Sequence, residues 1–336
     1  MAHRRGFALT DLTATVACVA ALAALCIGAG QRSRSHAYQA GSFNNLHEFA
    51  AVTSSYAADT NDTFWSFTWR TGEMRSQYAD INGMMQTAVG FAPSALQAVD
   101  IARRRVTPNI PVLSNWVPSI QCGHWVLSDY LDQPLSLWFA VSPGDRWRRT
   151  FANDPIGYQN NIYAPIQPNP ASSFHIPYST SYRIGPAFWS PDYTTDTQSS
   201  VVWANSQSVF QSIGNAPLII GGRRVSEVAY PSQKVFMYDY AQWSVRRPVQ
   251  WSYTHSRPPI LFVDGSAHAL ATQRANPGFQ PNSPTSPFPS SASYQPAPWE
   301  APNTGNPNQQ LQGRYFFTRA GLRGRDFDGP EVPATP

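Results

Sequence analysis

The feature that most constrains this chain is an uncharged apolar run near its amino terminus. Residues 12–30 are 19 residues without a charge, rich in Ala and Leu. A helix rises about 1.5 Å per residue, so this length can just cross a hydrocarbon core of about 30 Å. His3, Arg4 and Arg5 precede the run, and positive charge is retained on the cytoplasmic side. The sequence therefore predicts a single membrane helix with a cytoplasmic amino terminus and an extracytoplasmic remainder.

Three other kinds of amino-terminal segment begin in the same way. A secretory signal would be cut after small residues such as those at 28–30, but its apolar core is usually only about 7–15 residues long. A lipoprotein signal needs a small residue directly before a cysteine, and Leu25 precedes Cys26. A plain signal anchor with an incidental Asp11 stays open as an alternative.

Asp11 places a carboxylate at the start of the run, where an ionisable group is costly and needs a partner. Cleavage between Gly6 and Phe7 would create that partner, because the new α-amino group of Phe7 would lie about one helical turn from Asp11. A short basic leader ending in Gly, then Phe, then a carboxylate at the fifth mature residue resembles the amino terminus of type IV pilins and type II secretion pseudopilins.

The resemblance implies how this segment is processed and used. Prepilin peptidase would cleave after Gly6 and N-methylate Phe7, and Asp11 would pair with the amino terminus of a neighbouring subunit during assembly. Asp11 stands where this family usually has Glu, which is one methylene longer. The implied partners are prepilin peptidase, other pilin-like subunits and the inner membrane, which the chain would cross once.

Composition divides the rest of the chain. Phe43, Leu46, Ala50, Thr53 and Ala57 recur at three- and four-residue spacing, which predicts that the helix continues outward to about residue 58, with room for a break at Gly41 and Ser42. The polar residues between them, Asn44, Asn45, His47 and Glu48, are expected on the solvent face. A separate short surface helix is the open alternative. Aromatic and charged residues are each 13% of the chain and there are 30 prolines, which favours a β-rich extracytoplasmic domain. The expected segments are a leader (1–6), a transmembrane helix (7–30), an extended amphipathic helix (31–58), a β-rich domain (59–272), a flexible Pro/Ser/Asn-rich segment (273–312) and a carboxy-terminal segment (313–336).

Local patterns predict the elements of that domain. One helix is expected over residues 94–105, where Leu96, Val99 and Ala102 share a face. An irregular insertion is expected over 154–190. Strands are expected at 135–141, 201–210, 218–220, 234–243, 260–263 and 267–270. The predicted fold class is α+β and pilin-like, with a long amino-terminal helix packed on an antiparallel sheet that carries long irregular insertions.

The stretch THSRPPILFVDGSAHAL contains a strong hairpin signal. Asp264 and Gly265 separate two apolar runs, and Asp-Gly suits the positive φ angles of a type I′ turn. The stretch also resembles the ending of many bacterial pilin-like proteins, in which a His precedes Asp-Gly at the end of an apolar strand. Here His255 precedes Asp264 by nine positions, one fewer than in the commonest form. The upstream stretch RVSEVAYPSQKVFMYDYAQW resembles the same family's strand that ends in a carboxylate, here Asp239.

Metal binding is the weaker interpretation of these carboxy-terminal residues. Asp239, His255, Asp264 and His268 have the oxygen and imidazole donors that Ca²⁺ or Zn²⁺ can accept. Lone His and Asp residues near turns more often serve as hydrogen-bond partners, so we assign no metal and no cofactor, with calcium the weak alternative.

The sequence excludes or weakens several other functions. The net charge of +4 is scattered over arginines, without the concentrated basic face that nucleic-acid binding needs. No Gly-x-Ser-x-Gly, phosphate-binding Gly loop or His-Glu-x-x-His motif is present, so we expect no enzyme, although a tethered hydrolase stays open. The many aromatic residues would suit a binding module such as an adhesin or carbohydrate binder, but filling the core is the favoured role.

Overall fold

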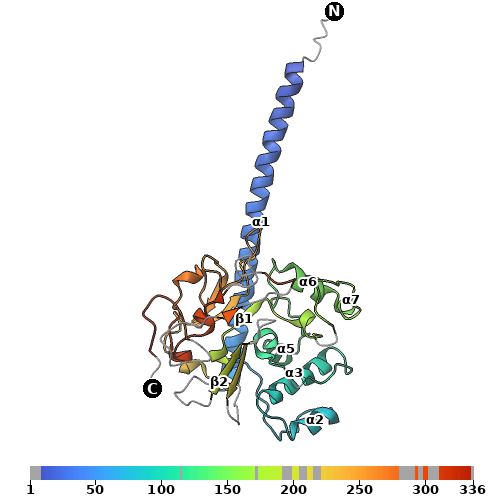
Figure 1. The fold of residues 1–336 in the computed structure, drawn as a ribbon, viewed down its shortest axis with the longest axis vertical. Helices are drawn as coiled ribbons and strands as arrows, with labels where there is room; N and C mark the ends of the chain where they lie inside the picture. Colours follow the sequence, from blue (N-terminus) through green and yellow to red (C-terminus); the bar gives the residue numbers. More distant parts are fainter. Residues whose placement is uncertain are drawn as a thin grey trace, which may run out of the picture.

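The computed structural model describes residues 9–113, 116–170, 173–190, 199–203, 210–214, 221–279, 292–293, 298–301 and 310–333. Its dominant feature is helix α1 (Leu9–Asp59), which projects from a body of short helices, a small sheet and extended chain (Figure 1). The described side chains between residues 12 and 34 are exposed, and we call residues 12–34 the stem. Residues 42–59, which pack on the body, form the docked half of the same helix.

The helix is continuous through Gly41, where the sequence left room for a break, and it ends for a local reason. Asn61 and Asp62 adopt left-handed backbone angles, with φ of 58° and 67°. The Asp62 amide then donates to the Ala57 carbonyl at 2.8 Å, which closes the last turn as in the left-handed caps that end many helices. This ending lies one residue beyond the position that the apolar spacing predicts.

A four-stranded antiparallel sheet supports the docked half of α1. Its strands lie in the order β1 (Tyr182–Ile184), β4 (Val235–Asp239), β5 (Pro259–Phe262) and β6 (Ala267–Ala269). β1 pairs with β4, β4 with β5 and β5 with β6. α1 contacts the three strands β4, β5 and β6. The strands β4 and β5 are buried throughout, because one face carries the helix and the other carries the rest of the chain.

Short helices cover the other side of the docked half (Figure 1). Each is too short to be stable alone and depends on tertiary packing. They are α2 (Ala79–Met85), α3 (Ala92–Arg105), α4 (Ser119–Cys122), α5 (Trp125–Tyr130), α6 (Arg146–Asn153) and α7 (Pro155–Gln159). Single 3₁₀ turns are η1 (Ile176–Tyr178), η2 (Pro186–Phe188), η3 (Val225–Glu227), η4 (Thr272–Arg274), η5 (Arg314–Phe316) and η6 (Gly321–Arg323).

Aromatic side chains fill much of the core, as the composition favoured. Phe49 on α1 is fully buried and packs edge-on against Phe139 at 4.8 Å and Tyr182 at 5.7 Å, measured between ring centroids. Phe64, Phe188 and Phe236 form a second group with centroids about 5 Å apart. Among the described tryptophans, Trp138 is the clear exception at 70% exposed. The described surface therefore gathers no patch of tryptophan.

Several strand predictions are confirmed and others are wrong. The helix predicted at 94–105 is α3, and the strands predicted at 234–243, 260–263 and 267–270 correspond to β4, β5 and β6. The single strand predicted at 201–210 is instead a hairpin of β2 (Ser199–Trp203) and β3 (Phe210–Gly214). The prediction at 218–220 falls outside the described residues. A further two-stranded pair joins β7 (Ala292–Ser293) to β8 (Gln310–Leu311).

The strand predicted at 135–141 is wrong for an instructive reason. Leu135, Leu137 and Phe139 are buried and Trp138 is exposed, so the alternation in the sequence is real. The backbone nevertheless turns here, because the Ala140 amide donates to the Leu137 carbonyl at 2.9 Å. Alternating burial thus arises from a turn packed on one side, without a neighbouring strand to form a ladder.

The stretch after β6 is held to the body at several points. Of the range expected to be a flexible segment, residues 273–279 and 298–301 are described, and Phe279, Trp299 and Ala301 are buried. The carboxy-terminal segment docks back on the body through Tyr315 and Phe327, both about 1% exposed. The described residues of this stretch therefore pack into the core of the body, although their Pro/Ser/Asn-rich surroundings in the sequence predict a flexible segment.

The structure confirms the α+β class, with mixed helices and a small antiparallel sheet. Across the described residues, no helix combines the length and the apolar character that crossing a membrane requires.

Candidate functional site

The residues predicted to be processed lie at the edge of the described chain. Gly6 and Phe7 fall outside the described residues, and Asp11 lies in the first turn of α1 without a described side chain. Their predicted roles in cleavage, methylation and assembly stay predictions. The described side chains of the stem include four exposed aliphatic residues, namely Leu12, Val16, Val19 and Leu22, at 51–60% exposure. A projecting apolar surface of this kind commonly marks a membrane or protein contact.

The Asp-Gly pair forms the predicted hairpin, but with another turn type. Gly265 has φ +86°, and Asp264 is not among the residues with positive φ, so the turn is not type I′. The Gly265 amide donates to the Phe262 carbonyl at 3.0 Å and the Phe262 amide donates to the Ser266 carbonyl at 2.8 Å. This is a three-residue loop with a left-handed Gly at its third position. The Asp264 carboxylate accepts from the Ser266 amide at 2.9 Å, which fixes the turn locally.

The four weak metal candidates do not form a site. His255, Asp264 and His268 are exposed, whereas Asp239 is 1% exposed. Asp264 follows the strand end that lies beside Val235, while Asp239 is at the opposite end of β4. Within the described part of the chain, no group of three or more His, Cys, Asp or Glu residues could hold a metal ion.

Asp239 instead lies at the junction between α1 and the sheet. Its carboxylate accepts hydrogen bonds from Ser42 on α1 at 2.7 Å, from Ser142 at 2.8 Å and from the Trp243 indole at 2.6 Å. The side chains of Ser42 and Asp239 are separated by 197 positions in the sequence, so this contact ties the helix to the end of β4. Buried polar groups of this kind are costly unless satisfied, and here three donors converge on one carboxylate.

Two further side chains extend this junction. The Tyr182 hydroxyl on β1 lies 3.0 Å from the Ser42 hydroxyl and accepts from the Asn45 amide at 3.1 Å. Asn45 also donates to the Val141 carbonyl at 3.1 Å. We call Ser42, Asn45, Ser142, Tyr182 and Asp239 the junction network. It connects α1, β1, β4 and the turn before α6 within one hydrogen-bonded group.

Burial gives Asp239 an unusual protonation equilibrium. Loss of solvation raises the pKa of Asp239 to about 7, although the hydrogen bonds from Ser42, Ser142 and Trp243 oppose the rise. Burial also raises the pKa of Tyr182 well above its ordinary value, so its hydroxyl stays protonated. The junction network is therefore sensitive to pH near neutrality through one group, Asp239.

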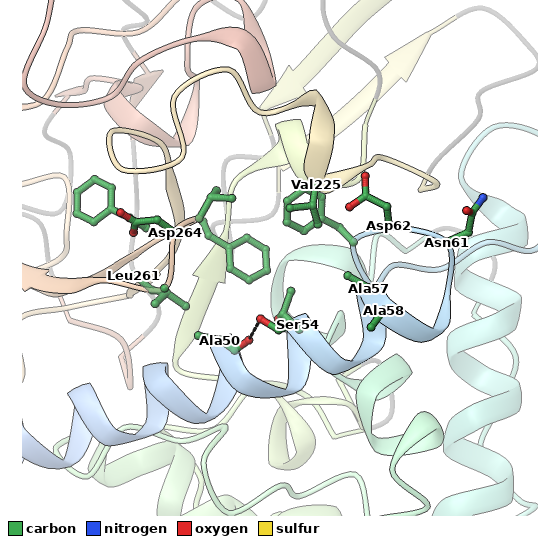
Figure 2. A pocket seen from close by; sticks show the side chains of 15 residues that line it. Ala50, Ser54, Ala57, Ala58, Asn61, Asp62, Val225, Leu261 and Asp264 are labelled. Carbon is green, nitrogen blue, oxygen red and sulfur yellow. Dashed lines mark hydrogen bonds between the residues drawn. The ribbon is translucent and has the colours of Figure 1, made fainter.

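A groove of about 570 Å³ opens at the other end of the sheet from the junction network, between the docked half of α1 and the β5–β6 hairpin. In Figure 2, Ala50, Ser54, Ala57 and Ala58 line it from the helix, while Asp264 and Asp62 lie toward its opposite ends. The Ser54 hydroxyl donates to the Ala50 carbonyl at 2.9 Å, so it is committed to the helix backbone. The groove is lined by Ala50, Thr53, Ser54, Ala57, Ala58, Asn61, Asp62, Phe64, Val225, Phe236, Leu261, Phe262, Val263, Asp264 and Gly265.

The groove is suited to contact more than to covalent chemistry. Its lining contains no His, Cys, Lys or Arg among the fifteen residues that define it. A general base or an activated nucleophile would need one of these groups or a carboxylate beside a hydroxyl. The Asp62 carboxylate accepts from the Ser226 amide at 3.0 Å. The Asp264 carboxylate accepts from the Ser266 amide at 2.9 Å and from the Ser266 hydroxyl at 2.6 Å. This carboxylate–hydroxyl pair closes the hairpin turn, and Ser266 is not among the residues that line the groove. Both carboxylates thus serve the turns that carry them.

Sequence reasoning identified part of this site and missed the rest. It singled out Asp239, Asp264 and Gly265, and it placed the docked half of α1 on the sheet. It assigned Asn45 to the solvent face, although Asn45 is 6% exposed, and it gave Ser42 no role. Their spacing in the sequence could have indicated this position. Ser42 precedes Leu46 by four residues and Asn45 precedes Phe49 by four residues, so both share the buried face of the helix with these core residues.

Comparisons with known proteins identify no relative: the chain matches no protein-family profile, no curated protein and no solved structure.

Proposed function

We propose that this protein is a pilin-like structural subunit of a type II secretion or type IV pilus kind, processed by prepilin peptidase at Gly6–Phe7. The observation that carries the proposal is the combination of a basic leader, the Gly-Phe junction and Asp11 at the fifth mature position. Under this proposal residues 7–30 hold the chain in the inner membrane, and the body lies outside the cytoplasm.

The shape of α1 supports the proposal. One helix of 51 residues combines an exposed stem with a half docked on an antiparallel sheet (Figure 1). Such a helix can place apolar side chains at a distance from the body while it stays rigidly attached to the body. The junction network and the buried Phe49 hold its docked half in place. The body then serves as the part that contacts other components.

The two carboxy-terminal resemblances support the same proposal. Asp239 ends β4 and the Asp264–Gly265 turn follows β5, so both motif positions lie at strand ends of the sheet that carries α1. A structural role suits their contacts, since Asp239 secures the helix and Asp264 secures the hairpin. We assign no catalytic residue.

Co-expression with a prepilin peptidase tests the proposal. The wild-type chain should lose its six-residue leader only when the peptidase is present, which a mass difference in the membrane fraction would reveal. A Gly6→Leu variant should stay uncut, because a bulky side chain at the cleavage position should block the peptidase. Cutting of neither chain, or equal cutting of both, would contradict the proposal.

Assembly is tested separately through Asp11. In cells that carry the matching machinery, Asp11→Ala should be processed normally but should reduce cross-linked subunit oligomers by about tenfold, because the Phe7 amine loses its partner. Asp11→Glu restores the usual residue of the resembled family and serves as the matched control. If Asp11→Ala assembles as well as the wild type, the pairing is wrong.

A further inference from the structure

The only lysine of the chain lies in its core. Lys234 comes directly before β4 and is 1% exposed. All other members of the Lys and Arg total of 24 are arginines, including the buried Arg148 and Arg183. An arginine keeps its charge, whereas a buried lysine can lose its proton and then acts as a nucleophile. A lysine at this position therefore offers chemistry that the arginines do not.

A buried carboxyl group lies against the Lys234 amine. Asp326 Oδ2 is 3.2 Å from Lys234 Nζ, and Asp326 is also 1% exposed. The fully buried Phe188 ring has its centroid 5.5 Å from the same nitrogen. Removing two charges from water is costly, and burial raises the pKa of Asp326, although the Lys234 charge opposes the rise. The surroundings thus shift this pair toward a neutral amine and a neutral acid, the two forms that can react with each other.

The backbone holds the two side chains in this arrangement. The Asp326 amide donates to the Gln233 carbonyl at 2.9 Å, and the Val235 amide donates to Asp326 Oδ2 at 2.8 Å. The residues on both sides of Lys234 are therefore bonded to Asp326. Fixing two reactants at close range makes their reaction intramolecular, with effective concentrations of about 10⁵–10⁸ M when the groups are well aligned.

Thr318 connects the amine to the second oxygen of the carboxyl group. Its hydroxyl accepts from Lys234 Nζ and donates to Asp326 Oδ1 at 2.5 Å, while its other acceptor, the Tyr315 carbonyl, is 3.4 Å away. A proton that leaves the amine can pass through this hydroxyl to Oδ1. Oδ2 meanwhile faces the Val235 amide, which stabilises negative charge on that oxygen in a transition state. One oxygen is thus suited to leave and the other to stay.

We propose that Lys234 and Asp326 join in an intramolecular amide bond, with Thr318 as the proton relay. The neutral Nζ attacks Cγ of the protonated Asp326 carboxyl group, and a carbon–nitrogen bond forms. The bond between Cγ and Oδ1 breaks, and Oδ1 leaves as water with the carboxyl proton and one amine proton. The other amine proton stays on the amide nitrogen, so the step needs no further reactant. This inference does not depend on the proposed filament role.

The bond would tie the start of β4 to the carboxy-terminal segment. Lys234 and Asp326 are 92 positions apart in the sequence. A covalent link that closes a long loop restricts the unfolded chain and so stabilises the fold. The link would also keep the segment after η6 attached to the sheet when other parts of the body open.

Peptide mass spectrometry of the purified full-length chain tests the bond directly. Trypsin cuts after a free lysine but not after a lysine whose amine is part of an amide. The linked protein should give a branched peptide that joins residues 225–246 to residues 326–336 and is lighter by one water than the two together. Release of residues 225–234 from folded wild-type protein, without the branched peptide, would leave a buried ion pair only and would overturn the proposal.

The position of the link is tested on the same peptide. Fragmentation should place it on Asp326 and not on Asp328 or Glu331, which lie in the same tryptic peptide. Lys234→Arg keeps a cation at this position but cannot form the bond, so this variant should give separate peptides. A link on another acidic residue, or a branched peptide that persists in Lys234→Arg, would contradict the proposed bond.

Thr318→Val tests the relay, because it removes the hydroxyl group and keeps both residues that are joined. The branched fraction, measured at successive times after a pulse of expression, should rise at least about tenfold more slowly than in the wild type. Thr318→Ser restores the hydroxyl and should link at the wild-type rate, which a role in packing alone does not predict. Linking of a folded Thr318→Val variant at the wild-type rate would show that the relay is wrong.

Discussion

At the scale of single residues, the most informative group is the Asp239 carboxylate. It takes three hydrogen bonds in a fully buried position, and burial still raises its pKa to about 7. The folded chain therefore holds a proton there more tightly than the unfolded chain, in which an aspartate has a pKa of about 3.9. The contribution to stability is fully present below the unfolded pKa and is lost as the pH rises through about 7.

This linkage predicts the behaviour of Asp239→Asn. The free energy of unfolding of the wild type should fall between pH 5 and pH 8 relative to the variant, by about 3 kcal/mol. Asparagine cannot ionise, and the hydroxyls of Ser42 and Ser142 can accept from its amide group. Urea denaturation at a series of pH values measures the difference. Asp264→Asn, on the exposed turn, is the matched carboxylate-to-amide control. A wild-type pH dependence equal to that of Asp239→Asn would contradict the account.

Gly265 gives a prediction about backbone conformation alone. Its φ of +86° suits glycine, while a Cβ built there meets no atom within 4 Å. Gly265→Ala should therefore destabilise the chain by about 1 kcal/mol through its backbone angle and not through a clash. Gly83 in α2 also has open space around a built Cβ but no positive φ, so Gly83→Ala should be neutral or stabilising by up to about 1 kcal/mol. Similar losses in both variants would contradict this account.

The sequence was informative at this scale where a residue's local chemistry decides its role. Asp264 and Gly265 were predictable as a turn because their own backbone preferences determine it. The turn type was not predictable, because it depends on which residues of the two strands pair. Here the Phe262 amide bonds to the Ser266 carbonyl, which makes the loop three residues long. The partners of Asp239 were not predictable either, since Ser42 and Ser142 lie 197 and 97 positions away.

At the scale of elements, the docked half of α1 holds the body together. Phe49 is fully buried and packs against rings from three separate segments, those of Trp65, Phe139 and Tyr182. The neighbouring sheet strands are three to five residues long, so few backbone hydrogen bonds join each pair of strands. They depend on burial against the helix.

Phe49→Ala should accordingly cost about 3–5 kcal/mol, because it leaves a cavity in a close-packed aromatic group. Val19→Ala is the matched comparison in the exposed stem of the same helix. It also truncates an apolar side chain to alanine, but this side chain is 60% exposed. It should change the free energy of unfolding by less than about 0.5 kcal/mol. Denaturant titration of both variants measures the contrast, and equal losses would contradict the division of α1 into a stem and a docked half.

Elements with strong periodic patterns were the predictable ones. α3 and the β5–β6 hairpin match their sequence patterns because each pattern is local and regular. β1 was missed because three residues inside an irregular stretch carry no periodic signal, and β1 exists only through its pairing with β4. The 135–141 stretch shows the converse, since its alternation comes from packing against the body without any partner strand.

At the scale of the whole molecule, the stem and the body are separable in energetic terms. The described side chains of residues 12–34 are exposed, so the body should not need them to fold. Deleting residues 1–30 should leave the thermal midpoint of the body within about 2 °C of the wild-type value. Calorimetry of both chains in the same detergent-containing buffer measures this. A drop of more than about 10 °C would show that the stem supports the body.

The central claim is that the chain is a processed pilin-like subunit, and the mature amino terminus tests it most directly. Intact and amino-terminal peptide mass spectrometry should be applied to the protein recovered from membranes of cells that contain a prepilin peptidase. The account predicts a mature chain that begins with N-methylated Phe7. A chain that keeps residues 1–6, or one that begins near Gln31, would contradict it.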